Sequence, residues 1–241
     1  MLKCMECGDE SCLKKVPLFS SLGDDELEKL AHRMTFKNYD KGQDILSQGK
    51  APGGITIICR GRAKAYRLTA NGTEKILYIF ARHDYIGEQY LFVNKAAAYT
   101  VTALQNVSAA FFSTKQFREI LNLYPAISLR LIEELGRRTI SLENILQTGG
   151  MRKTEARIAA MLSDFVRKYG VFGKDGIEIS LPLSREGMAN YLGMARETLS
   201  RKLSAFEKEG VIRSLSNKKI VILRPDILRK SAEDETDAYS R

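Results

Sequence analysis

Arginine, glutamate and serine side chains recur at short spacing in the last quarter of the chain, at Arg196, Glu197, Ser200 and Arg201. Arginine can donate two parallel hydrogen bonds to guanine, glutamate can accept one from cytosine, and serine can reach a base or a phosphate. A helix that exposes these groups can read base edges in a DNA major groove. Many solvent-exposed helices carry similar residues without binding DNA. The sequence on either side of these residues is therefore needed to distinguish the two cases.

Residues 183–203 have the pattern of two short helices joined by a tight turn. Ala189 lets the helices approach closely, and Gly193 stands where the turn needs a positive φ. This pattern predicts a helix-turn-helix in which the second helix presents the four polar residues. The apolar positions that would hold the pair to a core are one helical turn apart: Met188 and Leu192, then Leu199 and Leu203.

A basic hairpin is predicted directly after the second helix. Two β-rich runs, 211–213 and 220–223, flank the turn-forming residues 216–218. A helix-turn-helix followed by a basic hairpin is a winged helix. Residues 151–224 contain 15 Lys and Arg against 8 Asp and Glu, a net charge of +7, which favours a phosphate-binding module. The basic residues expected to meet the DNA backbone are Arg185, Lys202, Lys218 and Lys219.

The first half of the chain has a different texture. A helical stretch at 13–34 is followed, from 35 to about 113, by short β-rich runs separated by glycines and polar turns. Asn71 and Gly72 form a strong hairpin signal. These runs predict a small antiparallel barrel or jelly roll. Examples of these runs are 43–47, 54–59, 63–68, 74–80, 99–104 and 108–112.

A short helix at 115–123 and a long helix at 126–147 follow the β-rich region. The long helix carries Leu131, Leu135, Leu142 and Ile145, which step by 4, 7 and 3 residues and predict a dimerisation seam. A helix packed only on its own barrel is the alternative. Gly149 and Gly150 would end this helix and form a hinge before a further helix at about 153–169.

This order of elements resembles the CRP/FNR family of bacterial transcription regulators over residues 15–225. Two motifs carry the resemblance: Arg196-Glu-Thr-Leu-Ser-Arg201, and Gly87-Glu88, which is similar to the effector-pocket turn of the family. The resemblance implies an α+β fold with an N-terminal antiparallel β-roll of the cyclic-nucleotide-binding, jelly-roll type. A long dimerisation helix and a C-terminal winged helix-turn-helix would follow.

The resemblance also implies a function. It implies a homodimer that binds double-stranded DNA at a palindromic site with TGA-containing half-sites, contacts RNA polymerase and responds to a redox, oxygen or small-molecule signal. Glu197, Ser200 and Arg201 match the FNR branch of the family, whereas Arg196 matches the CRP branch. The direction of regulation and the outer bases of the half-site stay open.

The predicted domain boundaries follow from these elements. An N-terminal segment that contains cysteines precedes the β-roll domain, the dimerisation helix, the winged-helix domain and a polar tail. The five parts are expected at 1–14, 15–125, 126–149, 150–225 and 226–241.

Cyclic AMP is not an expected ligand. Family members that bind it carry an Arg-Ser pair after the Gly-Glu element, and here Ala97 and Ala98 occupy the matching positions. Without the arginine, a buried phosphate charge would lack its partner, which is costly. Lys95 as a displaced substitute is the alternative.

Cys4, Cys7 and Cys12 lie within the first twelve residues, and Cys59 is the fourth cysteine. Such clustering is typical of metal or redox chemistry in an intracellular protein. The resemblance implies a 4Fe–4S cluster, but the family's fourth cysteine, expected near Ala109, is missing. Three interpretations stay open: a cluster with Cys59 or a carboxylate as fourth ligand, a thiol switch or zinc site, and cysteines without a role.

Other classes of protein fit less well. No nucleophile–base pair, phosphate-binding loop or dinucleotide motif stands out, so no catalytic residues are expected. A cyclic-nucleotide-binding module that acts on a protein partner is the alternative function. No run of 18 apolar residues and no leader sequence is visible, and we therefore expect a cytoplasmic protein.

Overall fold

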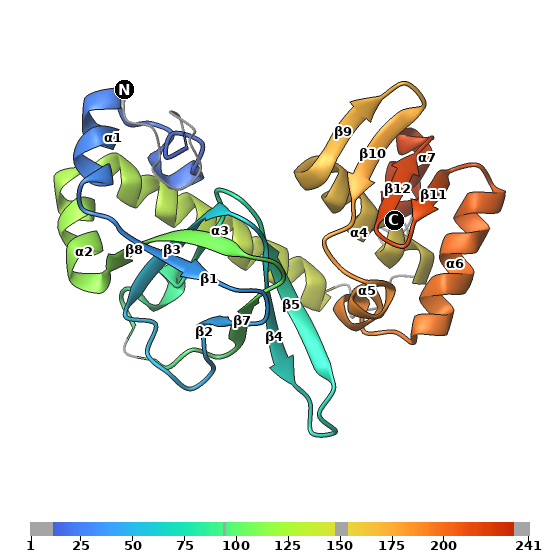
Figure 1. Ribbon diagram of the computed structural model, residues 1–241, viewed down its shortest axis with the longest axis horizontal. Helices are drawn as coiled ribbons and strands as arrows, with labels where there is room; N and C mark the ends of the chain where they lie inside the picture. The colour runs from blue at the N-terminus through green and yellow to red at the C-terminus, as the bar shows by residue number, and fades with distance from the viewer. Residues whose placement is uncertain (1–11, 94, 148–153, 234–241) are drawn as a thin grey trace. The chain divides into compact units, whose positions relative to one another are not determined.

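The computed structural model describes residues 12–93, 95–147 and 154–233 (Figure 1). The chain divides into two units, Met1–Asn144 and Ile145–Arg241. Each unit has its own sheets and core, and each is described by itself. Gly149 and Gly150, the predicted hinge, lie outside the described residues.

Two four-stranded antiparallel sheets form the β-roll of the first unit. The strand order is β1-β8-β3-β6 in one sheet and β2-β7-β4-β5 in the other. Both sheets contribute side chains to one apolar cluster, which therefore lies between them. The strands are β1 (Thr35–Tyr39), β2 (Asp44–Leu46), β3 (Gly54–Arg60), β4 (Ala63–Leu68), β5 (Glu74–Phe80), β6 (Tyr85–Ile86), β7 (Thr100–Ala103) and β8 (Val107–Ser113).

Strand β3 explains why one stretch of the sequence is almost continuously apolar. Its side chains alternate between the two faces of the sheet. Ile55, Ile57 and Cys59 enter a second apolar cluster on the outer face, while Ile58 points into the cluster between the sheets. A strand that is covered on both faces needs apolar residues at successive positions.

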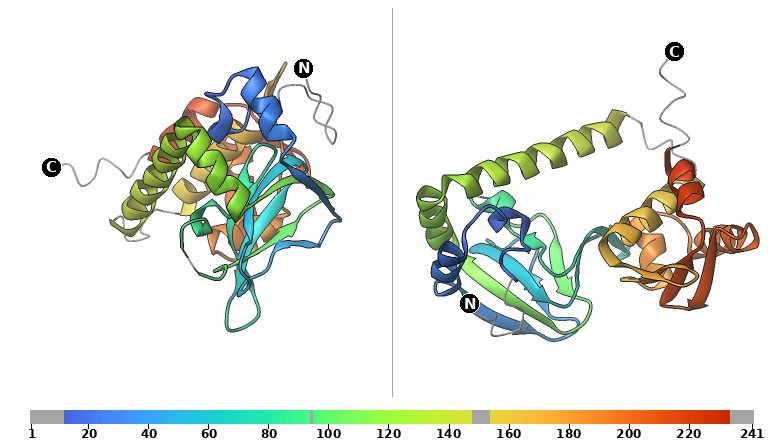
Figure 2. Two further views of the ribbon diagram at one scale, coloured as in Figure 1. Left: turned by 90° about the vertical axis from the view of Figure 1, so that its left-hand side faces the viewer. Right: turned by 90° about the horizontal axis from the view of Figure 1, so that it is seen from above.

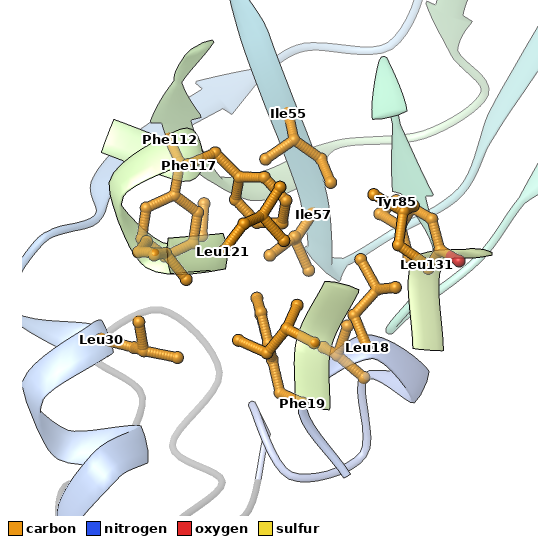
Figure 3. Close-up of a cluster of buried hydrophobic side chains, with 14 of the residues drawn as sticks. Leu18, Phe19, Leu30, Ile55, Ile57, Tyr85, Phe112, Phe117, Leu121 and Leu131 are labelled. Carbon is orange, nitrogen blue, oxygen red and sulfur yellow. The ribbon is translucent and has the colours of Figure 1, made fainter. Parts of the chain in front are cut away.

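Helices cover the outer face of the first sheet. They are the 3₁₀ turn η1 (Pro17–Phe19) and helices α1 (Asp24–Ala31), α2 (Thr114–Leu123) and α3 (Pro125–Gln147). In Figure 3 the rings of Phe19, Phe112 and Phe117 gather at the centre of this cluster, and their centroids are 5.9 to 6.5 Å apart. Residues near position 19 and near position 117 thus share one core.

Helix α3 is a single long helix that runs beside the roll (Figure 2). It begins at Pro125, a residue that suits the first turn of a helix because it has no N–H to leave unpaired. Helix α2, just before it, begins with a capping box in which the Ser113 hydroxyl accepts from Gln116 N and the Gln116 side chain accepts from Ser113 N.

The second unit is a winged helix-turn-helix domain. Its four-stranded antiparallel sheet has the order β11-β12-β10-β9. The elements are α4 (Thr154–Tyr169), β9 (Gly170–Gly173), β10 (Gly176–Ser180), α5 (Arg185–Leu192), α6 (Arg196–Lys208), β11 (Ile212–Ser216), β12 (Lys219–Ile222) and α7 (Pro225–Glu233).

The fold class predicted from the sequence is confirmed, with two differences in detail. The stretch at 13–34 is a 3₁₀ turn and one short helix, not a continuous helix. The polar tail predicted from residue 226 begins as helix α7, because Leu228 is buried in the contact between α7 and α4.

Candidate nucleic-acid interface

Local sequence signals set the two helices of the helix-turn-helix. The Ser184 hydroxyl begins α5 by accepting a hydrogen bond from Gly187 N at 3.1 Å. Gly193 follows α5 at φ 61° and ψ 46°, the left-handed conformation in which glycine carries no steric penalty. The short connection to α6 therefore has the turn chemistry that the sequence predicted.

A small apolar core fixes the recognition helix α6. Its buried residues are Leu199, Leu203 and Phe206, and those of α5 are Met188, Ala189 and Leu192. With these positions turned inward, Arg196, Glu197, Ser200 and Arg201 are all exposed. The structure therefore brings the four predicted base-reading residues together on the first half of one exposed helix.

The wing is a hairpin of β11 and β12 with Asn217 and Lys218 at its tip. Lys218 is exposed, whereas Lys219 Nζ lies 2.6 Å from Glu178 Oε1. Lys202 on α6 forms an ion pair with Glu155 on α4. Two of the predicted phosphate-binding lysines thus have acidic neighbours within the same domain.

Arg185 was predicted to contact the DNA backbone, but its surroundings differ from those of an exposed phosphate-binding side chain. Its Nη2 donates to the Ser214 hydroxyl at 3.2 Å, and the side chain is half-buried. Burial lowers the pKa of the guanidinium, and the charge of Glu207 opposes that shift. Sequence reasoning missed this group of side chains because no local pattern joins residues 185, 207 and 214.

The Gly87-Glu88 turn lies at a tightly packed point of the roll. Gly87 has φ 98°, and a Cβ built on it would lie 2.5 Å from Gly54 O. Both features require glycine. Glu88 begins the 3₁₀ turn η2 (Glu88–Tyr90) and is only 2% exposed. Its carboxylate is therefore part of the interior of the domain.

Comparisons with known proteins agree with this architecture. A cyclic nucleotide-binding domain model matches residues 36–124, and a Crp-like helix-turn-helix domain model matches residues 156–231. The chain is 30% identical to the probable transcriptional regulator flp of Lacticaseibacillus casei over 220 residues, which cover 90% of this chain and 95% of that protein. The chain belongs to the CRP/FNR family of transcription regulators.

Further similarities lie within the same family. The transcriptional activator protein FnrL of Cereibacter sphaeroides is 24% identical over 88% of this chain and 86% of its own length. The structure of FixK2 from Bradyrhizobium japonicum has the same fold, with a TM-score of 0.72 at 20% identity over 82% of this chain and 96% of that chain. As a CRP/FNR-type regulator, this protein is a sequence-specific DNA-binding protein.

Tyrosines occupy the surroundings of the two alanines that replace the Arg-Ser pair. Ala98 N donates to the Tyr90 hydroxyl at 2.8 Å, and Gln89 Nε2 donates to the Tyr99 hydroxyl at 3.0 Å. Burial is the main cause that raises the pKa of Tyr99, with the nearby Glu88 charge second, so this hydroxyl is neutral at ordinary pH. Ala97 is buried in the cluster between the two sheets, so neither position 97 nor position 98 supplies a cation for a cyclic phosphate.

The cysteines divide into two groups. Cys4 and Cys7 lie outside the described residues, while Cys12 and Cys59 are buried and are not joined in a disulfide. Cys59 packs in the outer apolar cluster, with its Sγ 3.9 Å from Ile57 O. Within the part of the chain that the structure describes, no three His, Cys, Asp or Glu side chains gather as metal ligands would.

The predicted dimer seam on α3 faces the roll where it can be observed. Leu131 is buried in the outer cluster and Leu135 packs against it, whereas the side chains of Leu142 and Ile145 lie outside the described residues. The exposed apolar residues of α3 are on another face: Leu129, Ile132 and Ile140 are 64%, 65% and 59% exposed.

Proposed function

We propose that this CRP/FNR-type regulator is a homodimer that binds a palindromic DNA site with TGA-containing half-sites and is switched by a redox, oxygen or small-molecule signal. The observation that carries the proposal is the exposed set Arg196, Glu197, Ser200 and Arg201 on α6. Arginine and glutamate are suited to base edges, and the buried core of the domain holds their helix in place.

The DNA backbone would be met by lysines at the edges of this surface. Lys218 at the wing tip is exposed and ready to contact a phosphate. Lys202 and Lys219 would exchange their ion pairs with Glu155 and Glu178 for phosphate contacts. Such contacts fix the position of the protein on the duplex and carry little sequence information.

Helix α3 would supply the two-fold axis. Leu129, Ile132, Gly136 and Ile140 recur at spacings of three and four residues, which places them on one helical face. That face is opposite the one that Leu131 uses against the roll, and an added Cβ at Gly136 would meet nothing within 4 Å. We therefore propose that a second copy packs on this face, while Leu131 and Leu135 face the roll.

The route from signal to helix would pass through the outer apolar cluster. Val16, Leu18 and Phe19, which follow the N-terminal cysteines, share this cluster with Leu131 of α3. A change in the N-terminal segment can therefore alter the packing of α3 directly. Two packings of one core that differ in energy by a few kcal/mol are a common basis of such switches.

The chemistry of Cys59 bears on the proposed cofactor. Its thiol is 2% exposed and lies among aliphatic and aromatic side chains. Cys59 would have to leave the apolar core to become the fourth ligand of an iron–sulfur cluster that Cys4, Cys7 and Cys12 also bind. Its surroundings therefore do not fit that role. The N-terminal cysteines stay our candidates for a redox signal, and cyclic AMP is not proposed.

RNA polymerase is the protein partner that we propose from the family relationship, and the cytoplasm is the proposed location. The exposed face of the recognition helix would stay free for DNA in such an assembly. In the described parts of the chain, no helix has the length and apolar character needed to cross a membrane.

A pair of variants tests the DNA-reading assignment. Arg201→Ala should weaken binding to a selected site by about 1–3 kcal/mol and relax its base preference, because a base contact is lost. Lys218→Ala should weaken selected and random duplexes alike. Fluorescence anisotropy with both duplexes measures the difference. Equal losses on the two duplexes for Arg201→Ala would remove this arginine from the reading surface.

A further inference from the structure

Three polar residues from three elements contact one another where the helix-turn-helix meets the wing. They are Arg185 of α5, Glu207 of α6 and Ser214 of β11. Arg185, the first residue of α5, donates from Nη2 to the Ser214 hydroxyl on β11 at 3.2 Å. The backbone N–H of Ser214 donates to Glu207 Oε1, near the end of the recognition helix, at 2.6 Å. These contacts join the helix-turn-helix to the wing at a single residue.

Ser214 is the point at which the wing changes its geometry. The pairing of β11 with β12 shifts between Ser214 and Ser216, so Leu215 is an extra residue that forms a β-bulge. A bulge bends its strand and redirects the residues beyond it. Ser214 therefore controls the direction in which the chain leaves the sheet toward Lys218.

The position of Arg185 does not favour a phosphate contact. Its Nη1 is buried and has no hydrogen-bond partner among the described residues, whereas Arg196 and Arg201 are exposed. A guanidinium that leaves water is retained where its partners compensate for the lost hydration. The Ser214 hydroxyl accepts from Nη2, and the charge of Glu207 favours the charged guanidinium.

We propose that Arg185, together with Glu207 and Ser214, is a positioning group that fixes the wing relative to the recognition helix. Arg185 then contributes to specific DNA binding without contacting the DNA backbone. The inference rests on the DNA-binding function proposed above. It assigns Arg185 a different role from the phosphate contact that the sequence predicted.

The first test is made without DNA, on the full-length protein. Arg185→Ala should increase amide hydrogen exchange in the wing at residues 214–219, because the bulge loses its anchor. Lys218→Ala, which changes the wing without touching this group, should leave exchange at Ser214 unchanged. Unchanged wing exchange in Arg185→Ala would overturn the proposal, whatever the DNA experiments show.

The second test uses salt dependence. A duplex selected by the wild-type protein from a random pool and a scrambled duplex are titrated at several salt concentrations. Arg185→Ala should lose roughly tenfold affinity for the selected duplex while the scrambled duplex and the salt slope stay unchanged. A fall of about 0.9 in the slope of log K against log salt, with equal losses on both duplexes, would identify a phosphate contact and refute the positioning role.

Arg185→Lys guards against a variant that fails to fold. Lysine keeps the positive charge but cannot provide the planar fork of arginine. If Arg185→Ala fails to fold, Arg185→Lys should still fold and bind the scrambled duplex with wild-type affinity. It should nevertheless lose preference for the selected duplex. Full recovery of that preference by lysine would show that charge alone is needed and would contradict the proposal. Failure of the wild-type protein to prefer any duplex would instead count against the DNA-reading assignment.

Discussion

Single glycines decide how closely the backbone of the roll can pack. Gly87 combines φ 98° with a carbonyl, Gly54 O, 2.5 Å from the place of an added Cβ. Gly87→Ala should therefore lower the free energy of unfolding by about 2–4 kcal/mol, since a positive φ and a backbone clash add. Urea denaturation of the purified protein measures the change.

Gly42 is a matched control for this substitution. It has φ 89°, close to that of Gly87, but an added Cβ would meet nothing within 4 Å. Gly42→Ala should therefore cost only about 1 kcal/mol, the conformational contribution alone. Equal losses for the two variants would show that the contact with Gly54 O does not matter.

The residue scale also shows what local patterns can predict. Gly193 and the apolar positions of α5 and α6 were predicted because each follows from spacing within one short segment. The environment of Arg185 was not, since its partners are 22 and 29 residues away. Contacts between distant segments leave no mark in the local sequence pattern.

Helix α3 has two apolar faces, and its outward face gives a prediction at the scale of the element. Ile132→Asp should weaken self-association by at least about 2 kcal/mol, because a charge would be buried between the two copies. Sedimentation equilibrium measures the dissociation constant. Glu133→Gln, on the neighbouring exposed position, should change it little. A wild-type dissociation constant in Ile132→Asp would exclude this face from the dimer.

Strands of the roll with apolar runs or hairpin signals were predicted, whereas two strands without such signals were not. Strand β3 was recognised from its apolar run, and β4 and β5 from the hairpin signal between them. Strand β1 was missed because all five of its residues are exposed or half-buried and only Phe36 and Tyr39 are strongly apolar. Strand β6 has two residues, too few for any periodicity.

The long helix shows a different limit of sequence reasoning. Spacing predicted an apolar seam through Leu131 and Leu135, but a seam does not say what it packs on. In the structure these two residues pack against the roll. The outward face has Gly136 at its centre and was therefore less visible as an apolar stripe.

Charge pairs within the winged helix act at the scale of the whole molecule. Glu178 holds Lys219, and it also places negative charge beside the surface proposed to meet DNA. Glu178→Gln should raise affinity for random duplex about two- to fivefold at low salt, with the gain disappearing at high salt. Anisotropy titrations measure it. Glu119→Gln, which removes the same charge from α2 in the other unit, should have a smaller effect.

Ligand response is a second property of the whole chain. A ligand that binds the folded state at about 100 times its dissociation constant stabilises that state by about 2.7 kcal/mol. With Ala97 and Ala98 beside Tyr90 and no paired arginine, about 1 mM cyclic AMP should leave the melting temperature unchanged. A clear rise in a thermal shift assay would show that the roll binds the nucleotide by other residues.

The shared core of the first unit has a consequence for protein synthesis. Phe19 packs against Phe112 and Phe117, and Leu131 completes the same cluster. A nascent chain therefore cannot close this core when helix α1 leaves the ribosome, since Phe112 and Phe117 are made about a hundred residues after Phe19. Long-range contacts of this kind fold slowly and leave apolar surface uncovered in the meantime. The segment that contains Phe19 is therefore made before its partners and is among the last to pack.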